Sequence, residues 1–330
     1  MKNKFFTLLA LLLSCVISTF VAEFSLRFFL PQPLYSFEKG LFISSPDYGY
    51  ALTPNVVKYH RQPDYNYLIK SNSEGFRGRE PDNKADNRIL VLGDSYGMGQ
   101  GVSEGKSMCD LTYQHFKASG KSLDIFNTSI SGYAGINELG VLKRQLTYYN
   151  PHLVILLFFW NDLGVTESLR VQNGYLVVNF GNPQTAPLRE WLNNNSHFYA
   201  LMKRSWYAFK RPKTKTAIPV IPQSDIDVAL DYIFRMKKLC DQHNAAFVTV
   251  LLPEDGVYAG GPAIQACREK MIKELKINAV SYRDWTQVVP QEGREQYIFR
   301  HDQHWNEQGN AYFSRYLIQV IDDLLKRRQR

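Results

Sequence analysis

Five short apolar runs alternate with helical patterns along most of the chain, and this alternation constrains the fold more than any other feature. The runs are residues 88–93, 124–130, 152–159, 246–252 and 278–282. The helical patterns are residues 107–117, 136–149, 226–243, 262–275 and 308–327. Apolar runs of this length, separated by helices, are typical of parallel strands buried on both faces. The sequence therefore predicts an α/β fold with a mostly parallel five-stranded sheet.

An uncharged apolar run of 18 residues, 5–22, lies near the amino end of the chain. As a helix it extends about 27 Å, close to the thickness of a bilayer core. The run is longer than a usual signal-peptide core and no A-x-A cleavage site follows it, which favours an uncleaved transmembrane anchor over residues 1–30. An alternative interpretation takes Leu12 to Cys15 as a loose lipoprotein box, with Cys15 lipidated.

Positive charge gathers in three places. Lys2 and Lys4 precede the apolar run, which predicts a cytoplasmic amino end and an extracytoplasmic body, periplasmic or extracellular. The stretch from Lys203 to Lys215 and the tail from Lys326 to Arg330 together account for the net charge of +8. Two basic segments on a near-neutral body favour contact with an anionic surface over nucleic-acid binding. Two solvated stretches without a partner are the alternative.

Composition and segment boundaries predict one main domain with an insertion. The chain has 330 residues, of which 45% are apolar and 21% charged. This composition provides enough apolar residues for a full core and excludes long disordered segments. Residues 31–85 form a strand-and-turn lead-in packed on the main domain, 86–330. Residues 163–223 form an insertion with a hairpin at Asn173-Gly174 and a helix over 188–210. An insertion at this edge shapes substrate access, or else it is a surface or membrane-resting element.

A candidate nucleophile, Ser95, lies in Gly93-Asp94-Ser95-Tyr96-Gly97 directly after the first predicted strand. A sharp turn there exposes a serine hydroxyl and its N–H at the rim of the sheet, where a nucleophile and an oxyanion donor are useful. The same residues satisfy the G-x-S-x-G elbow of α/β-hydrolases. That fold places several strands before the nucleophile, whereas Ser95 follows the first strand.

A serine nucleophile needs a base, and His304 lies two residues after Asp302 in a predicted loop. The carboxylate of Asp302 would orient the imidazole while the other ring nitrogen faces the serine. Taken singly, a surface ion pair is the commoner role for such a histidine.

Gly132 and Asn161 follow the second and third strands and would join the Ser95 N–H as three oxyanion donors. The four cysteines form no CxxC pair, and no metal or organic cofactor is predicted.

The order Gly-Asp-Ser, Gly, Asn-Asp and Asp-x-His resembles the SGNH, or GDSL-type, hydrolase superfamily over about residues 87 to 325. The resemblance implies a flavodoxin-like three-layer α/β/α sandwich. It also implies Ser95 as nucleophile, His304 as base, Asp302 as its partner, and Ser95, Gly132 and Asn161 as the oxyanion hole. The lead-in is similar to that of bacterial members carried on an N-terminal membrane anchor, and the histidine loop resembles that of envelope polysaccharide O-acetylation proteins.

Three positions depart from the usual pattern of that superfamily. Phe159 stands where many members have glycine, Tyr96 replaces leucine or phenylalanine, and the histidine loop reads Asp-x-His where many secreted esterases have Asp-x-x-His. The first and third departures bear on the shape of the oxyanion site. The Asp-x-His spacing favours the anchored or acetylation-linked branches over lipases.

These features together predict a serine ester hydrolase or O-acyltransferase acting through an acyl-enzyme on envelope-associated esters, such as O-acetyl groups of a glycan. The expected partners are an ester-bearing glycan or small acyl ester, and the membrane. Two alternatives of other classes stay open. The first is a non-catalytic glycan-binding or assembly subunit that retains the fold, and the second is a structural protein that rests on the membrane through its basic segments.

Overall fold

The computed structural model describes residues 2–32, 34, 36–62, 64–177, 186–210, 221–254, 261–290 and 292–328. Its centre is a sheet of five strands: β6 (Asn87–Gly93), β7 (Leu123–Asn127), β8 (Leu153–Phe158), β11 (Ala246–Leu251) and β12 (Ser281–Asp284). All neighbouring strands are parallel, in the order β12-β11-β8-β6-β7. Numbered along the chain, this order is 2-1-3-4-5, which is flavodoxin-like. The predicted fold class is confirmed.

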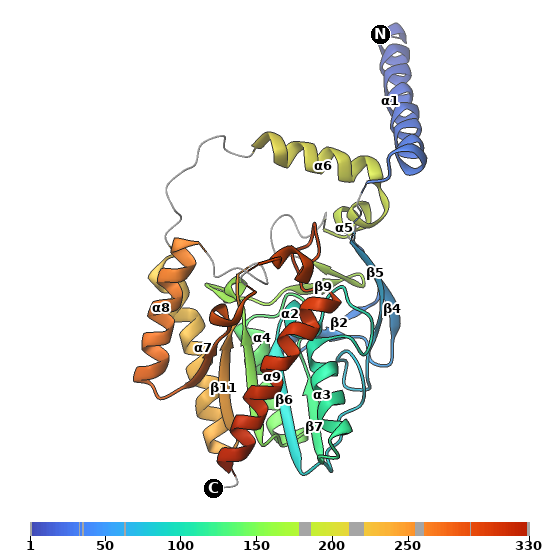
Figure 1. The fold of residues 1–330 in the computed structure, drawn as a ribbon. Helices are drawn as coiled ribbons and strands as arrows, with labels where there is room; N and C mark the ends of the chain where they lie inside the picture. The colour runs from blue at the N-terminus through green and yellow to red at the C-terminus, as the bar shows by residue number, and fades with distance from the viewer. Residues whose placement is uncertain are drawn as a thin grey trace.

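Helices cover both faces of this sheet (Figure 1). α3 (Met108–Ala118) and α9 (Glu307–Arg328) pack on one face, and α4 (Gly135–Tyr148), α7 (Gln223–Gln242) and α8 (Pro262–Ile277) share a core with the other. Strand β6 shows why both faces of the sheet need a covering layer, because its apolar side chains point alternately to one face and to the other. Ile89 and Val91 are buried with α3 and α9, while Leu90 and Leu92 are buried with α4 and α7. The result is a three-layer sandwich.

Two strands differ from their predicted bounds by three residues at one end, for local reasons, and the other three strands differ by at most one residue at either end. The second strand ends at Asn127, because the Asn127 side chain accepts a hydrogen bond from the Ser129 N–H (3.2 Å) and turns the chain. The fifth strand begins only at Ser281, since Ala279 has a left-handed backbone, φ +51°, and cannot continue an extended strand.

The lead-in consists of short antiparallel strands that share the main core. They are β1 (Ser36–Phe37), β2 (Phe42–Ser45), β3 (Gly49–Leu52), β4 (Val57–Gln62) and β5 (Tyr65–Lys70). The rings of Tyr50 and Tyr133 lie 5.0 Å apart, and both side chains are buried. The Tyr133 hydroxyl donates to the Tyr50 carbonyl (2.5 Å). These contacts place the lead-in directly over the loop that follows β7.

The insertion contains the predicted hairpin but two helices where one was expected. β9 (Arg170–Gln172) and β10 (Tyr175–Val177) pair across Asn173-Gly174, both with positive φ as a tight hairpin turn requires. The prediction of a single helix over 188–210 is wrong. Instead, α5 (Ala186–Asn195) ends before Ser196 and α6 (His197–Lys210) begins after it. The Ser196 hydroxyl accepts a hydrogen bond from the Tyr199 N–H (3.0 Å) in the first turn of α6. Of the predicted basic stretches, residues 211–215 and 329–330 lie outside the described residues.

The apolar amino end forms one helix, α1 (Lys2–Phe29), which projects from the body in Figure 1. Its segment Lys4–Phe29 has a mean hydropathy of 2.4, and none of the window that defines it is buried. By length and composition this helix can cross a membrane, as a membrane anchor or as part of a signal sequence. Four short helical turns complete the structure: α2 (Ser95–Met98), η1 (Trp160–Asp162), η2 (Trp285–Val288) and η3 (Arg294–Tyr297).

Candidate active site

Ser95 is the first residue of α2, at the point where strand β6 ends. The Asp94 carboxylate caps this turn, because its Oδ1 accepts from the Tyr96 N–H at 2.9 Å. The turn lies at the carboxyl edge of the sheet, between β6 and β8, where the strand order reverses. Ligands of open α/β sheets bind at such reversals.

The structure brings together the three residues predicted as nucleophile, base and orienting acid. The His304 Nε2 lies 2.7 Å from the Ser95 Oγ, and the His304 Nδ1 lies 2.9 Å from the Asp302 Oδ1. A carboxylate only accepts, so the proton on this imidazole belongs on Nδ1 and leaves Nε2 to accept from the serine hydroxyl. Ser95 and His304 are 209 positions apart in the chain. This is the geometry of a general base on a serine.

The Asp302 carboxylate is held from its other side by residues that the sequence analysis missed. Its Oδ2 accepts from the Tyr65 hydroxyl, at the start of β5, and from the Gln100 Nε2 at 3.4 Å. Gln100 also donates to the Tyr65 oxygen (2.9 Å) and accepts from the Ser131 hydroxyl (2.7 Å). Burial raises the pKa of Asp302, but hydrogen bonds from His304, Tyr65 and Gln100 lower it by more, so its pKa lies below the usual range.

The backbone of the histidine loop is fixed by a second lead-in residue, Asp64. Its carboxylate accepts from the N–H groups of His301 (2.5 Å) and Asp302 (3.1 Å), and also pairs with the His301 Nδ1 at 2.6 Å. Gln303 has a φ of +68°, which turns the chain so that the side chains on either side of it meet. The lead-in thus builds part of the site, through Asp64 and Tyr65, which carry no recognisable motif.

Gly132 lies in the loop that follows β7, next to a carbonyl that the lead-in holds in place. The Tyr50 hydroxyl donates to the Ser131 carbonyl at 2.8 Å, and because a peptide unit is planar and trans, the Gly132 N–H points the opposite way. Among the described residues this N–H has no acceptor. Gly132 has a φ of +82°, and an added Cβ would lie 2.9 Å from Leu169 and 3.0 Å from the Tyr50 hydroxyl. Only glycine suits this position.

Asn161 follows β8 and reaches the nucleophile turn from the neighbouring strand. Its Nδ2 donates to the Asp94 Oδ2 at 3.1 Å, which uses one of its two amide protons. The side chain is otherwise exposed, so the second proton is available to a ligand. The structure therefore places Asn161 next to the Ser95 turn.

The two unusual aromatic residues of the motif pack against each other beside the base. The rings of Tyr96 and Phe159 lie 4.5 Å apart, and Tyr96 also lies 4.9 Å from the rings of His304 and Trp305. The Tyr96 hydroxyl donates to the Gln303 carbonyl at 3.3 Å. Phe159 therefore packs against Tyr96, and the Tyr96 ring forms one wall for the imidazole.

Three carboxyl groups lie buried beneath the nucleophile turn. They belong to Asp94, Glu138 and Asp162, each at most 3% exposed. Burial raises the pKa of all three, and their mutual repulsion raises those of Glu138 and Asp162 further. Both carboxylate oxygens of Asp162 and the Oε1 of Glu138 have no hydrogen-bond partner among the described residues. The pKa values of Glu138 and Asp162 therefore lie well above the usual range of a carboxyl group.

This cluster predicts a loss of stability as the pH rises. A carboxyl group with a raised folded-state pKa contributes stability that is fully present below its unfolded value, about 4.3 for glutamate, and that is lost as the pH rises through the folded value. We expect the melting temperature to fall between pH 5 and pH 9 in the wild type and to fall less in Glu138→Gln. Each 1 kcal/mol corresponds to about 2–4 °C. Exposed Glu104→Gln is the control; parallel curves for all three proteins would contradict the prediction.

No protein-family model and no curated protein sequence matches the chain. Among solved structures, esterase EstA from Pseudoalteromonas sp. is 15% identical, with a TM-score of 0.46 over 73% of this chain and 100% of that chain. The acetyl xylan esterase AlAXEase is 12% identical, with a TM-score of 0.46 over 71% and 99%. A lipolytic protein of the G-D-S-L family from Veillonella parvula is 11% identical, with a TM-score of 0.42 over 71% and 97%.

All three TM-scores lie below 0.5, so the fold assignment rests on the strand order of this chain. That order is flavodoxin-like, as the SGNH resemblance implies. Two of these solved structures are esterases, and the third is a lipolytic protein of the G-D-S-L family. The resemblance to the SGNH superfamily is confirmed for the fold, and the membrane-anchored branch stays a prediction.

Proposed function

We propose that the protein is a serine-dependent ester hydrolase or O-acyltransferase that works through an acyl-enzyme. The observation that carries this proposal is the pair of hydrogen bonds from Ser95 to His304 (2.7 Å) and from His304 to Asp302 (2.9 Å). Together they supply a nucleophile, a base and an orienting carboxylate, which are the three parts needed to attack an ester carbonyl.

In the proposed reaction the Ser95 Oγ attacks the ester carbonyl carbon while the His304 Nε2 takes the hydroxyl proton. The negative oxygen of the tetrahedral intermediate accepts hydrogen bonds from the N–H groups of Ser95 and Gly132 and from the Asn161 side chain. The bond to the alcohol then breaks, and the alcohol leaves with the proton held by His304. An acyl group remains on Ser95. Asp302 stays ionised and stabilises the imidazolium.

Water or a sugar hydroxyl completes the cycle. His304 removes a proton from this acceptor, whose oxygen attacks the acyl carbon, and the proton returns to Ser95 as the acyl bond breaks. Water gives a hydrolase and a sugar hydroxyl gives an O-acyltransferase. Envelope-associated esters, in particular O-acetyl groups of a glycan, are the proposed substrates. The orientation predicted from Lys2 and Lys4 supports an extracytoplasmic site on a membrane anchor, α1.

Loss of the nucleophile or the base tests the reaction. We expect Ser95→Ala and His304→Ala each to reduce hydrolysis of p-nitrophenyl acetate by at least about 10³-fold, and Asp302→Asn to reduce it less. A fluorophosphonate probe should label the wild type but not Ser95→Ala. Exposed Ser103→Ala is the control. Undiminished turnover in either alanine variant would refute the assignment, and an unlabelled, inactive wild type would favour the non-catalytic glycan-binding alternative.

Asn161 tests the oxyanion hole separately. Because its amide is proposed to bond the oxyanion more strongly than the ground-state carbonyl, Asn161→Ala should lower kcat by about 10²-fold with little change in KM. The side chain is exposed, so the variant should fold normally. Asn83→Ala, also exposed, is the matched control. A change confined to KM would contradict the proposed role.

Tyr65 tests whether the lead-in positions the acid. Tyr65→Phe removes a hydrogen bond to a charged carboxylate, and we expect kcat to fall by about tenfold. The pKa of Asp302 should rise, because its charged form loses a donor, and NMR titration of this carboxyl measures the rise. Tyr59→Phe, on the same hairpin, is the control. An unchanged pKa of Asp302 would leave Tyr65 with a packing role alone.

A further inference from the structure

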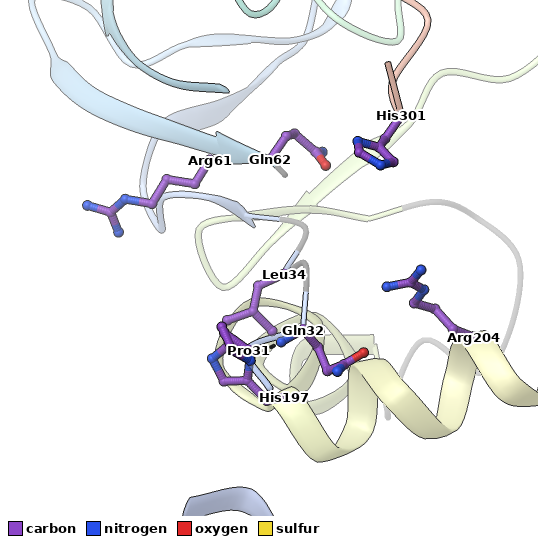
Figure 2. A pocket seen from close by; sticks show the side chains of 8 residues that line it. All are labelled: Pro31, Gln32, Leu34, Arg61, Gln62, His197, Arg204 and His301. Carbon is purple, nitrogen blue, oxygen red and sulfur yellow. Dashed lines mark hydrogen bonds between the residues drawn. The ribbon is translucent and has the colours of Figure 1, made fainter. Parts of the chain in front are cut away.

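A cavity of about 820 Å³ lies between the insertion, the lead-in and the histidine loop. Figure 2 shows its lining, which comprises Pro31, Gln32, Leu34, Arg61, Gln62, His197, Arg204 and His301. Gln62 and His301 lie on one side, Gln32 and His197 on the opposite side, and Arg204 extends from α6 toward His301. The Arg61 guanidinium points away from the other labelled side chains. The volume is ample for a lipid headgroup or a sugar.

The cavity adjoins the proposed catalytic residues through His301. Asp64 holds the N–H groups of His301 and Asp302 on the same carboxylate oxygen, at 2.5 and 3.1 Å. The cavity wall and the acid of the triad are therefore parts of one fixed loop. A ligand bound against His301 lies next to the loop that carries His304.

The opposite wall belongs to the end of the apolar helix. Pro31 and Gln32 follow the end of α1 after one residue, Leu30, and the Gln32 N–H donates to the His197 Nδ1 at 2.8 Å. The Glu23 carboxylate on α1 accepts from the N–H groups of His197 (3.0 Å) and Phe198 (2.8 Å), which are the first residues of α6. α6 consequently starts at a fixed point on α1 and runs across its end (Figure 1).

One face of α6 is suited to the surface of a bilayer. Met202, Trp206 and Phe209 follow one another at spacings of four and three residues and are 54%, 57% and 85% exposed. Apolar side chains on one face of a helix, with basic residues beside them, are typical of helices that lie in the membrane interface. Where α1 spans the bilayer, α6 then lies among the headgroups, and the cavity opens beside them.

The guanidinium that faces the other lining residues is that of Arg204. None of the lining residues is acidic, and neither Arg61 nor Arg204 pairs with a carboxylate in the part of the chain that the structure describes. The Gln62 side chain lines the opposite side of the cavity. A guanidinium that has no carboxylate partner among the described residues favours an anion with several acceptor oxygens, and phosphate is the anion that arginine binds best in this way.

We propose that this cavity binds the phosphate group of a lipid-borne ligand at the membrane surface. Arg204 contributes the charge, and the Gln62 side chain lines the opposite side of the cavity. The proposal implies that the substrate is an ester carried on a phosphate-bearing lipid, and this part rests on the proposed function. Binding of the lipid phosphate in the cavity does not depend on turnover.

Binding is measured on the full chain carrying Ser95→Ala, in maltoside detergent and phosphate-free buffer, by titration calorimetry. The probes are dioctanoyl phosphatidylglycerol, dioctanoylglycerol, which lacks the phosphate, and inorganic phosphate. We expect the phosphatidylglycerol to bind at least about tenfold more tightly than dioctanoylglycerol. Arg204→Glu and, independently, Gln62→Glu should each weaken it by about tenfold or more. Arg235→Glu, an exposed charge reversal on α7, should leave the affinity unchanged.

Equal affinity for the two lipids, or an unchanged affinity in both Arg204→Glu and Gln62→Glu with circular dichroism intact, would overturn the proposal. Inorganic phosphate that binds as tightly as the phospholipid would also overturn it, since the ligand would then be free phosphate. The Ser95→Ala background prevents hydrolysis. If the phospholipid binds but the wild type has no esterase activity, the proposed function is wrong and the proposed binding of lipid phosphate in the cavity still holds.

Discussion

The hydrogen bond between Ser95 and His304 depends on a loop held in place from outside the main sheet. Ser95 is fixed by its own strand and by the Asp94 cap, but His304 comes from a loop more than 200 positions later. That loop is bound by Asp64 through its backbone and by Tyr65 through Asp302. The lead-in hairpin thus holds the histidine loop, and removing it would take away the hydrogen bonds of Asp64 to the loop backbone and of Tyr65 to Asp302.

The sheet and the chemically distinctive residues could be predicted because both follow from local patterns. Apolar runs alternating with helices determine a parallel sheet, and the carboxyl ends of parallel strands meet at one edge. Ser95 and Asn161 directly follow two adjacent strands, so their proximity is a consequence of strand order. His304 is predictable for another reason: few histidines have an aspartate two residues away in a loop that precedes a helix.

The residues that could not be predicted act through contacts between segments far apart in sequence. Tyr65 is one of twenty tyrosines, and nothing in its neighbourhood indicates that its hydroxyl meets Asp302, 237 positions later. The break between α5 and α6 has the same origin. The pattern over 188–210 is compatible with one helix, but Ser196 donates to Glu23, which is 173 positions earlier, and that carboxylate caps the second helix. Tertiary hydrogen bonds override local helical preference here.

The same carboxylate makes the apolar helix part of the site's architecture. Glu23 joins α1 to α6, and Arg27 on α1 pairs with Glu23 at 2.8 Å and donates to the Asn195 carbonyl at the end of α5. Arg204 on α6 and His301 on the histidine loop line the same cavity. The helix α5 packs against α6 and against β10 and β1, so the direction of α1 is tied through α6 and α5 to that of the body that carries the Ser95 edge. A flexible tether would leave that direction free; α1, packed in this way, presents the serine at a defined angle to whatever surface the helix enters.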